Sequence, residues 1–424
     1  MTRGDRGQPR VAVVGAGVSG LTAAYLLRRT HQVTLFERED RLGGHAHTHD
    51  VDTATTSVVV DSGFIVLNDR TYPLLRRLFA QLGVEVRATE MSMGVSCDGC
   101  GLGFVGGRGP AGIFAQRRRL VDPGFWRLLR GVRRFQRAAL AQVRDAPLSL
   151  ETYGDFLERV GFRRSFVQHY ALPVVSCVWS SGHQDALDYP ASYLFAFLSH
   201  HGFLAQGDAP QWYVVEGGSR AYVDAVRGQL DDVRSSDPVG SVARKADRVV
   251  VTDSAGRELD FDRVVIATHA DEALALLSDP SPAEFDVLGA FRYSANATQL
   301  HTDDSVLPAP DRERASWNLH MASCDVDSES VQVSYWMNRL QHHAETSPLL
   351  VTLNGADVVD AERVVAEMAY THPVFTPTSV AAQRRLPRIQ TERTAYAGAY
   401  HGWGFHEDGC RSGVAAAEHF GATW

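Results

Sequence analysis

Three histidines stand at alternate positions in the stretch RLGGHAHTHD, residues 41–50, directly after a double glycine. On an extended strand this spacing places His45, His47 and His49 on one face, and imidazole nitrogens are common zinc ligands. A tetrahedral zinc site on that strand would need a fourth ligand. The other hypothesis is that the two glycines carry the function, so the neighbouring elements have to decide between the two.

Five cysteines form the second group of reactive side chains. Cys97 and Cys100 form a Cys-x-x-Cys motif, in SCDGCG, and thiols at this spacing can bind a metal or exchange disulfides. However, Asp98-Gly99 stands between the strand-like runs MGVS and GLGF and is a strong signal for a type I′ turn. We therefore predict a β-hairpin there, no disulfide framework and no metal site, which suits a reducing compartment.

The elements that position these residues begin with RVAVVGAGVSGLTAAYLL. A buried strand leads into Gly15-x-Gly17-x-x-Gly20 and then into a helix. Gly15 makes a tight turn, Gly17 lets the backbone approach a pyrophosphate, and Gly20 lets the helix pack on the strand. The next strand, QVTLFE, ends at Glu37, about 20 residues further on, where a Rossmann unit has an acid for the ribose. This stretch predicts a dinucleotide-binding domain without choosing between NAD and FAD.

The residues after Glu37, REDRLGGHAHT and then VVVDSGFIVLN, resemble the second dinucleotide signature of the FAD-dependent amine oxidase superfamily. That superfamily includes monoamine oxidases, phytoene desaturases and protoporphyrinogen oxidase. In it, the double glycine passes close to the FAD diphosphate, and the strand that here contains Asp61-Ser62-Gly63 runs beside the flavin ring. The resemblance implies FAD as the cofactor and a cofactor contact for His45, and it leaves His47 and His49 as structural residues.

The second half of the chain is similar to a narrower group, the bacterial "predicted NAD/FAD-binding protein" members of this superfamily. These are often encoded beside cyclopropane fatty acid synthase-like methyltransferases. The likeness is specific about family and says little about reaction. Six segments carry it: LHTDDSVLP (300–308), ASWN (315–318), VSYWMNRLQ (333–341), LLVTLN (349–354), YTHPVF (370–375) and YAGAYHGWGFHEDGCRSGVAAAE (396–418).

The resemblance implies an α/β chain in which a Rossmann-like FAD-binding domain of the amine oxidase type (GR2-type) is interleaved with a substrate domain. The FAD domain would take residues 1–80, 212–285 and 388–424. The substrate domain would take 81–211 and 286–387, as a mixed sheet plus a helical region at about 110–211.

The C-terminal motif GFHEDGCRSGVAAAEHFG has a physical reading of its own. His406 to Gly409 precede an alanine-rich helix, whose free N–H groups and positive dipole end can stabilise negative charge on a reduced flavin. We name His406 as the residue that handles protons, because histidine titrates near neutral pH. Tyr400 and Asn318 are the other catalytic candidates.

The remaining site predictions combine the motifs with the resemblance. The expected cofactor contacts are Gly15, Gly17, Ser19, Gly20, Glu37, Arg38, Arg41, Gly43, Gly44, His45, Gly63, Phe64, Val239, Thr268, Trp403, Phe405, His406, Glu407, Asp408 and Gly409. The expected substrate contacts are His301, Trp317, Tyr335, Asn338 and Gln341.

Composition limits the partners and the location. A net charge of −8, with 44% hydrophobic and 22% charged residues, is typical of a globular protein and gives no reason to expect nucleic acid. The chain has no 18-residue apolar run and no signal-like start. We expect a cytoplasmic protein, and the sequence says nothing of its oligomeric state.

The substrate is the least determined point. Many amine oxidases of the superfamily hold a water against flavin N5 with a substrate-domain lysine, whereas Lys245, the only lysine here, falls in the FAD-domain part. This lowers the expectation of amine oxidation and of rapid oxygen use. The preferred hypothesis is dehydrogenation of an apolar, fatty-acyl or isoprenoid-like, small molecule. An amine or amino-acid oxidase that produces peroxide is the alternative. A non-catalytic carrier on the same fold, as in the Rab GDP-dissociation inhibitors, is the third hypothesis.

An arginine-rich segment, 117–137, also points towards lipid. Asp122 is a candidate N-cap, Pro123 the first helical residue, and the following helix is apolar on one face and basic on the other. Such a helix can lie on an anionic membrane surface. The other hypothesis is that its apolar face packs on the protein core.

Overall fold

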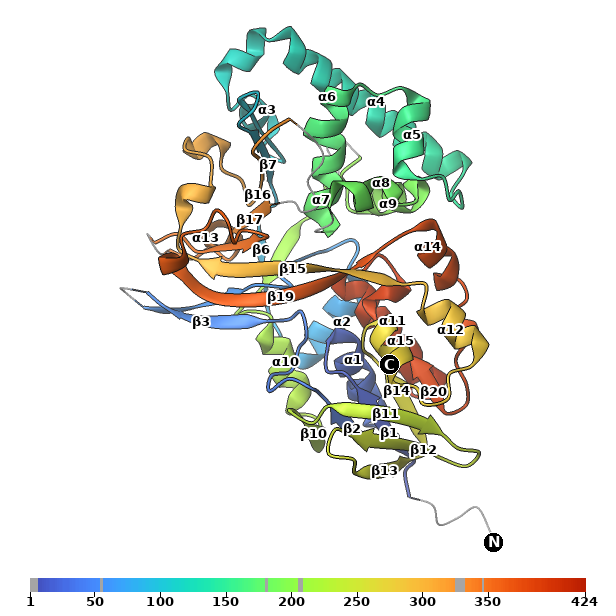
Figure 1. Cartoon of the computed structure of the whole chain (residues 1–424). Coiled ribbons are helices and arrows are strands. Elements are labelled where there is room, and N and C mark those ends of the chain that lie inside the picture. Colours follow the sequence, from blue (N-terminus) through green and yellow to red (C-terminus); the bar gives the residue numbers. More distant parts are fainter. Residues whose placement is uncertain (1–6, 54–55, 180–181, 205–208, 325–331, 345–346) are drawn as a thin grey trace.

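The computed structural model describes residues 7–53, 56–179, 182–204, 209–324, 332–344 and 347–424. Its lower part is built on a five-stranded parallel sheet (Figure 1). Mostly apolar runs form the central strands, because both faces of a parallel sheet are covered. The strand order is β10 (Asp232–Arg234), β2 (Gln32–Phe36), β1 (Arg10–Val14), β14 (Arg263–Ile266) and β20 (Thr394–Tyr396).

Each face of this sheet has its own hydrophobic core. One core contains α1 (Val18–Leu27), α2 (Pro73–Leu82), α10 (Arg220–Arg227) and α15 (His406–His419). The opposite core contains a three-stranded meander and the helices α11 (Ala270–Leu276), α12 (Pro282–Leu288) and α14 (Pro377–Gln383). The meander consists of β11 (Val239–Arg244), β12 (Val249–Asp253) and β13 (Glu258–Phe261). This three-layer arrangement confirms the predicted α/β class.

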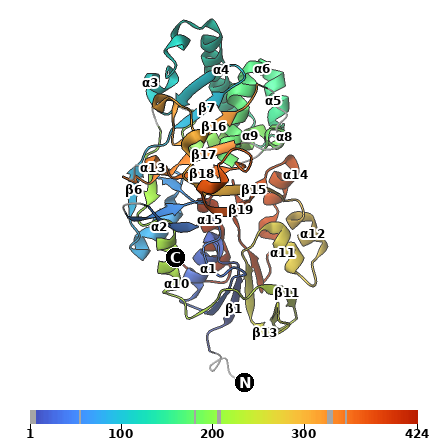
Figure 2. The ribbon, with the colours of Figure 1, turned by 60° about the vertical axis from the view of Figure 1, so that its left-hand side comes forward.

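A seven-stranded mixed sheet forms the second large layer and lies between the parallel sheet and the helical region (Figure 2). Its two longest strands, β15 and β19, form an extended antiparallel pair over the first domain. Only β16 and β7 pair in parallel among its strands. The order is β19 (Val364–Val374), β15 (Arg292–His301), β18 (Leu350–Leu353), β17 (Gln332–Trp336), β16 (Trp317–Met321), β7 (Met93–Cys97) and β8 (Leu102–Gly106).

Two small sheets connect the layers. The hairpin of β3 (Thr48–Asp52) and β4 (Ser57–Asp61) follows the double glycine. The other small sheet has the order β5 (Val66–Asn68), β9 (Trp212–Val215) and β6 (Val86–Thr89). The predicted first-domain segments 1–80, 212–285 and 388–424 supply all strands of the parallel sheet, and where the boundary between the domains falls stays a prediction.

The helical region covers the upper end of the molecule (Figure 1). Aromatic side chains form its core, including Phe135, Tyr153, Phe156 and Phe195. Its elements are α3 (Gly109–Ile113), the 3₁₀ turn Arg117–Val121, α4 (Pro123–Asp145), α5 (Tyr153–Val160), α6 (Arg164–Phe166), the π-helical segment Val167–Ala171, α7 (Leu172–Trp179), α8 (His183–Asp188) and α9 (Ala191–His200).

The predicted start of α4 is confirmed. The Asp122 carboxylate accepts hydrogen bonds from the backbone N–H groups of Gly124 (2.8 Å) and Phe125 (3.3 Å), and Pro123 is the first helical residue. Phe125 and Phe135 are buried. The apolar face of α4 therefore packs on the core, which removes it from direct contact with a membrane.

The predicted hairpin at the Cys-x-x-Cys motif is confirmed as β7 and β8, but the predicted two-residue turn is wrong. Cys97 pairs with Leu102, so the loop has four residues, and Gly101 takes the left-handed conformation (φ 63°). A type I′ turn would need positive φ at both central residues, and Asp98 and Gly99 do not have it. The longer loop presents Cys100 at the tip of the hairpin.

In the part of the chain that the structure describes, no helix is both long enough and apolar enough to cross a membrane.

Candidate active site

The glycine loop between β1 and α1 has the geometry that a dinucleotide requires. Gly15 has φ 98°, a conformation open to glycine but strained for other residues. A Cβ on Gly20 would overlap the carbonyl oxygen of Gly15, so this glycine lets α1 pack against the strand end. A Cβ on Gly17 would meet no described atom within 4 Å. The space before the α1 N-terminus is therefore open to a ligand.

The double-glycine segment packs directly against this loop. Gly43 pairs with Gly17 in a parallel bridge, and its N–H donates to the Ala16 carbonyl oxygen at 2.9 Å. Gly44 (φ 56°) passes so close that a Cβ on it would lie 3.2 Å from the Gly17 Cα. Arg41 donates to the Gly44 carbonyl oxygen at 2.7 Å and holds the turn. Two glycine-rich backbones thus border one space.

Glu37 lies at the end of β2, beside the same loop. Its carboxylate accepts hydrogen bonds from the backbone N–H groups of Ala16 (2.8 Å) and Glu39 (3.0 Å). The Asp237 N–H donates to the Glu37 carbonyl oxygen at 3.0 Å, which brings the start of β11 and Val239 to this edge. Glu37 is half-buried, so its carboxylate is oriented and still accessible.

The N-terminal ends of α1 and α15 lie side by side and point the same way. A Cβ on Gly409 would press on Val18 and Ser19, and one on Gly413 would meet the carbonyl oxygen of Ser19. The two helices therefore pack in parallel at close range. Each has free backbone N–H groups at its first turn, and together they present two positive dipole ends to one region.

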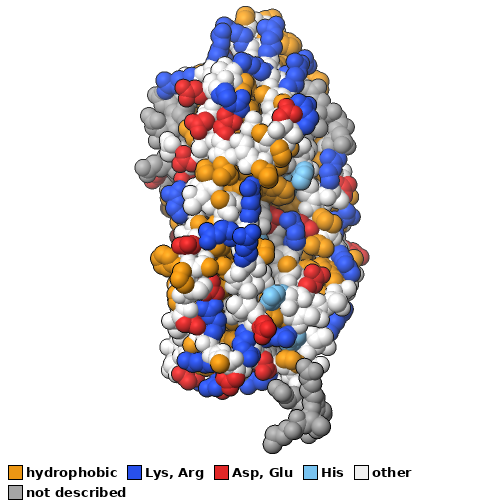
Figure 3. Space-filling model, turned by 90° about the vertical axis from the view of Figure 1, so that its right-hand side faces the viewer, with side chains coloured by type: hydrophobic (Ala, Val, Ile, Leu, Met, Phe, Trp, Pro, Cys, Tyr) orange, Lys and Arg blue, Asp and Glu red, His pale blue; other side chains and the backbone are white. Residues whose placement is uncertain are grey.

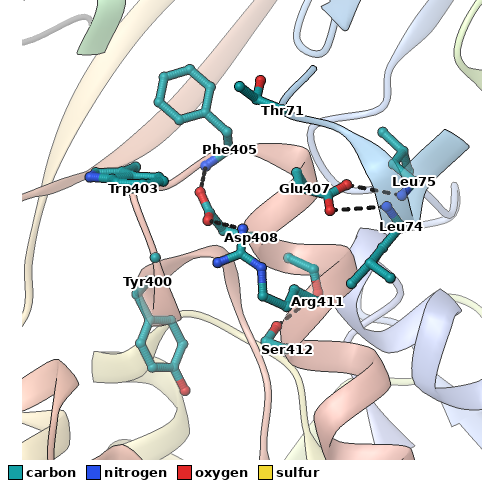
Figure 4. Close-up of polar contacts among 12 residues, drawn as sticks. Thr71, Leu74, Leu75, Tyr400, Trp403, Phe405, Glu407, Asp408, Arg411 and Ser412 are labelled. Atoms are coloured by element: carbon teal, nitrogen blue, oxygen red, sulfur yellow. Dashed lines mark hydrogen bonds and ion pairs between the residues drawn. The ribbon is translucent and has the colours of Figure 1, made fainter. Parts of the chain in front are cut away.

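The carboxylates of the C-terminal motif have structural partners (Figure 4). Glu407 accepts from the backbone N–H groups of Leu74 (3.0 Å) and Leu75 (2.9 Å), and so caps α2. Asp408 accepts from the Phe405 N–H (3.1 Å) and from Arg411 (2.9 Å). Burial raises the pKa of Glu407 to about 7 and that of Asp408 to about 6. These side chains position the helix end, and its backbone is the part left for a ligand.

Trp403 and Phe405 face the helical region. The Trp403 indole N–H donates to the Tyr193 carbonyl oxygen (3.2 Å), and the Phe405 ring stacks on Phe197 with centroids 4.6 Å apart. Tyr400 points away from both in Figure 4 and packs against Phe291. The C-terminal loop thus joins the two parts of the molecule.

A cluster of histidines lies where β15 and β19 cross the first domain. The His45 ring has its centroid 5.1 Å from Tyr370, 5.4 Å from His372 and 6.3 Å from His269. The Asn296 amide is 3.0 Å from His372 Nδ1. We call His45, His269, His372 and Tyr370 the histidine cluster.

Only His45 of this cluster was assigned to the site from the sequence. His269 follows β14, and Tyr370 and His372 stand on alternate positions of β19, so their meeting depends on the packing of the two sheets. Two features of the sequence indicated these residues. His269 follows the predicted contact Thr268, and Tyr370 and His372 lie in YTHPVF, one of the family-like segments.

Burial favours the neutral form of the imidazoles in the cluster. It lowers the pKa of His372 to about 4 and holds the pKa of His45 well below its usual range. Burial also lowers the pKa of His269. A neutral imidazole offers one donor and one acceptor, so the cluster presents hydrogen-bonding groups without charge.

His406 stacks on Phe64 with ring centroids 3.7 Å apart at 13°. Burial lowers its pKa to about 3. Burial thus opposes the expected titration near neutral pH, because apolar surroundings disfavour the imidazolium. Within the described residues, the His406 Nε2 atom is buried without a hydrogen-bond partner.

Asp61 anchors the strand beside the site. Its carboxylate accepts from Thr48 Oγ1 (2.6 Å), from the Ser219 N–H (2.9 Å) and hydroxyl (2.7 Å), and from the Gln341 amide (2.9 Å). Burial raises its pKa to about 6, and the hydrogen bonds from Thr48 and Ser219 oppose that rise. Gly63 follows, where a Cβ would overlap the His45 carbonyl oxygen. These contacts fix the position of His45.

Several predicted substrate residues lie in structural networks. His301 is fully buried and bonds Thr352 Oγ1 at 2.7 Å. Asn338 accepts from the Leu349 N–H (2.7 Å), and Gln341 bonds Asp61. Trp317 and Tyr335 pair across β16 and β17, with ring centroids 5.3 Å apart.

Asn318, a predicted catalytic residue, also has local partners. Its amide bonds the backbone N–H (2.8 Å) and carbonyl oxygen (2.7 Å) of Ala315. It stands on β16, which β17 and β18 separate from β15. At about 4.8 Å per strand, the structure does not bring Asn318 to the histidine cluster.

His47, just before β3, and His49, within it, have ring centroids 4.1 Å apart. His45 lies in the turn before the strand, so the predicted strand with three histidines is not formed. His47 Nδ1 lies 3.0 Å from the Tyr370 hydroxyl, and His49 Nε2 lies 2.8 Å from the Ser62 hydroxyl. Among the described residues, these histidines belong to no group of three or more potential metal ligands.

Of the other predicted cofactor residues, Thr268 and Ser19 lie beside the glycine loop, and Arg38 lies on the surface. A Cβ on Gly15 would lie 3.3 Å from the Thr268 methyl group, and Ser19 is buried against Ser412. Arg38 forms an exposed ion pair with Glu272 at 2.6 Å.

The fold and the site define a class, an α/β protein with a Rossmann-like glycine loop and a second, mixed sheet. The residues fit a dinucleotide cofactor, because Gly17 leaves open space before two parallel helix ends and His406 keeps an unpaired buried nitrogen among the described residues. The sequence model of the flavin containing amine oxidoreductase family matches residues 18–358 of this 424-residue chain. The chain belongs to this family, and a flavin is the cofactor that membership implies.

Individual relatives match shorter segments. The flavin-dependent L-tryptophan oxidase RebO of Lentzea aerocolonigenes is 31% identical over 125 residues, 28% of this chain and 26% of the relative. The carotenoid phi-ring synthase of Streptomyces griseus is 40% identical over 87 residues, 19% of this chain and 17% of the relative. The matched segments thus span about a quarter or less of these relatives.

Solved structures match the whole chain. A putrescine oxidase variant superposes with a TM-score of 0.70 at 16% identity, covering 98% of this chain and 99% of the other. The CLA-producing fatty acid isomerase from P. acnes gives 0.69 at 15% identity, covering 97% and 99%. At these identities the similarity establishes a common fold and no shared reaction.

Proposed function

We propose that the chain is an FAD-dependent oxidoreductase that dehydrogenates an apolar, fatty-acyl or isoprenoid-like substrate. When bound, a flavin accepts a hydride at N5 from a substrate C–H bond. The protein then has to hold the cofactor, orient the C–H bond and exclude water.

FAD is favoured by the elements that surround the glycine loops. The open space at Gly17 suits a diphosphate, because helix N-termini and free backbone N–H groups bind anions. Glu37 is placed to accept from a ribose hydroxyl, and the start of β11 near Val239 would border the adenine. Arg41 would act indirectly, by holding Gly44, and the exposed Arg38 is the weakest member of this set.

The observation that supports an uncharged substrate is the histidine cluster, whose burial favours neutral imidazoles. Burial lowers the pKa of each imidazole, and Tyr370 adds an aromatic side chain. Lys245, the only lysine, stands in the turn between β11 and β12, where its N–H donates to the Arg248 carbonyl oxygen. The cluster therefore supplies hydrogen bonds that orient a neutral group, and no cationic lysine.

Within this proposal, His406 positions the cofactor as a neutral imidazole, and His45 and His372 contact the cofactor or the substrate. The test is anaerobic reduction of the purified holoprotein by a panel of host lipids. Bleaching of the flavin by a lipid supports the proposal, and a His372→Gln variant should bleach more slowly per bound flavin. A flavoprotein that no host lipid reduces would contradict it.

An amine or amino-acid oxidase is the second candidate, because the tryptophan oxidase named above is among the relatives. Peroxide release with an amine or amino acid, at a rate above that with lipids, would establish this alternative.

We further propose that the helical end of the molecule contacts an anionic membrane surface. Just before and within the first turn of α4, Leu120, Val121 and Trp126 are exposed by 51%, 85% and 41%. Figure 3 shows basic side chains gathered over this upper end. A groove of about 610 Å³ beside α4 is lined by Phe125, Leu128 and five arginines, Arg119, Arg127, Arg130, Arg134 and Arg163.

The corresponding test is sedimentation with vesicles. Binding to phosphatidylglycerol vesicles and not to phosphatidylcholine vesicles is expected, and Val121→Asp should weaken it. Leu148→Asp is the matched control, since Leu148 is 69% exposed beyond the other end of α4. If Val121→Asp and Leu148→Asp bind phosphatidylglycerol vesicles as well as the wild-type protein does, the segment around Val121 is not the contact surface.

A further inference from the structure

Four potential metal ligands from three distant segments meet at the junction of the mixed sheet and the helical region. Cys97 ends β7, Cys100 stands in the hairpin loop, Cys324 follows β16, and His169 belongs to the π-helical segment. Their three sulfur atoms and one imidazole nitrogen all lie within 4.8 Å of one another. Figure 1 shows β7 and β16 next to α6 and α7.

The distances between these atoms suit a single tetrahedral ion. Zinc binds sulfur at about 2.3 Å and imidazole nitrogen at about 2.0–2.1 Å, so neighbouring ligand atoms are about 3.5–3.8 Å apart. The Cys97 and Cys324 sulfurs are 3.6 Å apart, and the Cys100 sulfur is 3.4 Å from His169 Nε2. The group is too compact to surround a cluster of several metal ions.

The orientation of His169 is also that of a ligand. Its Nδ1 lies 2.9 Å from the Ser165 carbonyl oxygen and donates to it. This hydrogen bond fixes the tautomer and leaves the Nε2 lone pair facing the sulfurs, as second-shell carbonyls do in zinc sites. The π-helical turn at this position is a local departure from α-helix that frequently marks functional sites.

The hairpin supplies the remaining geometry. Because the loop has four residues with Gly101 in the left-handed conformation, Cys100 comes close to the sulfur atoms of Cys97 and Cys324. A two-residue turn at Asp98-Gly99 would place Cys100 within the opposite strand. The four-residue loop thus brings the second cysteine of the Cys-x-x-Cys motif into the same group as the first.

We propose that Cys97, Cys100, Cys324 and His169 bind one Zn²⁺ ion as a structural site. Four protein ligands leave no open coordination position for a reacting water, which is the character of structural zinc. The ion ties the β7–β8 hairpin and the end of β16 to the helical region. Its binding to three thiols and a neutral imidazole releases up to three protons, without oxidation or reduction.

The experiment is elemental analysis of the purified holoprotein after gel filtration in metal-free buffer. About one zinc per chain is expected, with X-ray absorption at the zinc edge showing three sulfur neighbours and one nitrogen. Cys100→Ser and His169→Gln should lose most of the zinc. The controls Cys177→Ala, in α7, and His419→Asn, on the exposed end of α15, should retain it.

Chelation of the wild-type protein keeps the test valid if a variant fails to fold. Removal of zinc should lower the melting temperature, and added Zn²⁺ should restore it. The proposal is overturned if the wild-type protein has no zinc and takes up none, or if both cluster variants retain it. It is also overturned if the denatured, unreduced protein shows three free thiols instead of five, because two cluster cysteines then form a disulfide.

Discussion

The glycine loop allows cofactor binding and folding to be perturbed separately. At Gly17 (φ −70°, ψ 179°) alanine fits the backbone, and its methyl group meets no described atom within 4 Å. The apoprotein should lose at most about 1 kcal/mol, because alanine is a poorer N-cap. The methyl group would instead occupy the space of the diphosphate and remove at least one charge-assisted hydrogen bond, about 1.5–3 kcal/mol. The FAD dissociation constant should therefore rise about 10- to 150-fold.

Gly20→Ala should lower folding stability more than FAD affinity, since its methyl group would overlap the Gly15 carbonyl oxygen. Overpacking of this kind costs about 1–3 kcal/mol of folding stability. The assays are urea unfolding of the apoproteins and fluorescence titration with FAD, with Gly228→Ala at the end of α10 as the control. FAD binding by Gly17→Ala with wild-type affinity would falsify the placement of the diphosphate.

Three further predictions concern stability. Asp61→Asn should lower the free energy of unfolding by about 3 kcal/mol, because an amide N–H₂ would face the Ser219 donor; an unchanged urea midpoint would refute this. For His372, the folded pKa of about 4 lies below the unfolded value, about 6.5. The wild-type protein should therefore lose about 1.4 kcal/mol per pH unit from this group as pH falls from 6.5 to 4, and His372→Gln should remove that slope. For Glu407, the folded pKa of about 7 lies above the unfolded value, so its stability is lost as pH rises from about 4.5 to 7. Glu407→Gln should abolish this opposite slope in urea unfolding across the same range; parallel wild-type and variant curves would contradict either assignment.

Local features of the sequence predicted the fold well. The glycines, the strand before them and the acid after the next strand are close in sequence, and their roles follow from backbone conformation. The same holds for Asp122 and Pro123 at the start of α4. In each case the interaction that matters lies within a few residues or one supersecondary unit.

Contacts between distant segments could not be predicted in the same way. His269 and His372 meet His45 because β15 and β19 cross the first domain. The hydrophobic periodicity of the sequence does not predict how these two strands pack on that domain. Cys97 and Cys324 are separated by 227 positions, so the Cys-x-x-Cys motif alone favoured a plain hairpin. The titration of His406 depends on burial, which its position in a motif does not reveal.

The most direct test of the account is the absorbance spectrum of the purified protein, followed by identification of the flavin after acid precipitation. The account predicts flavin absorbance bands at about one equivalent per chain, with FAD as the flavin, and a lower flavin content in Gly17→Ala after gel filtration. A colourless wild-type protein that binds no added FAD would contradict it, and would favour a carrier function on the same fold.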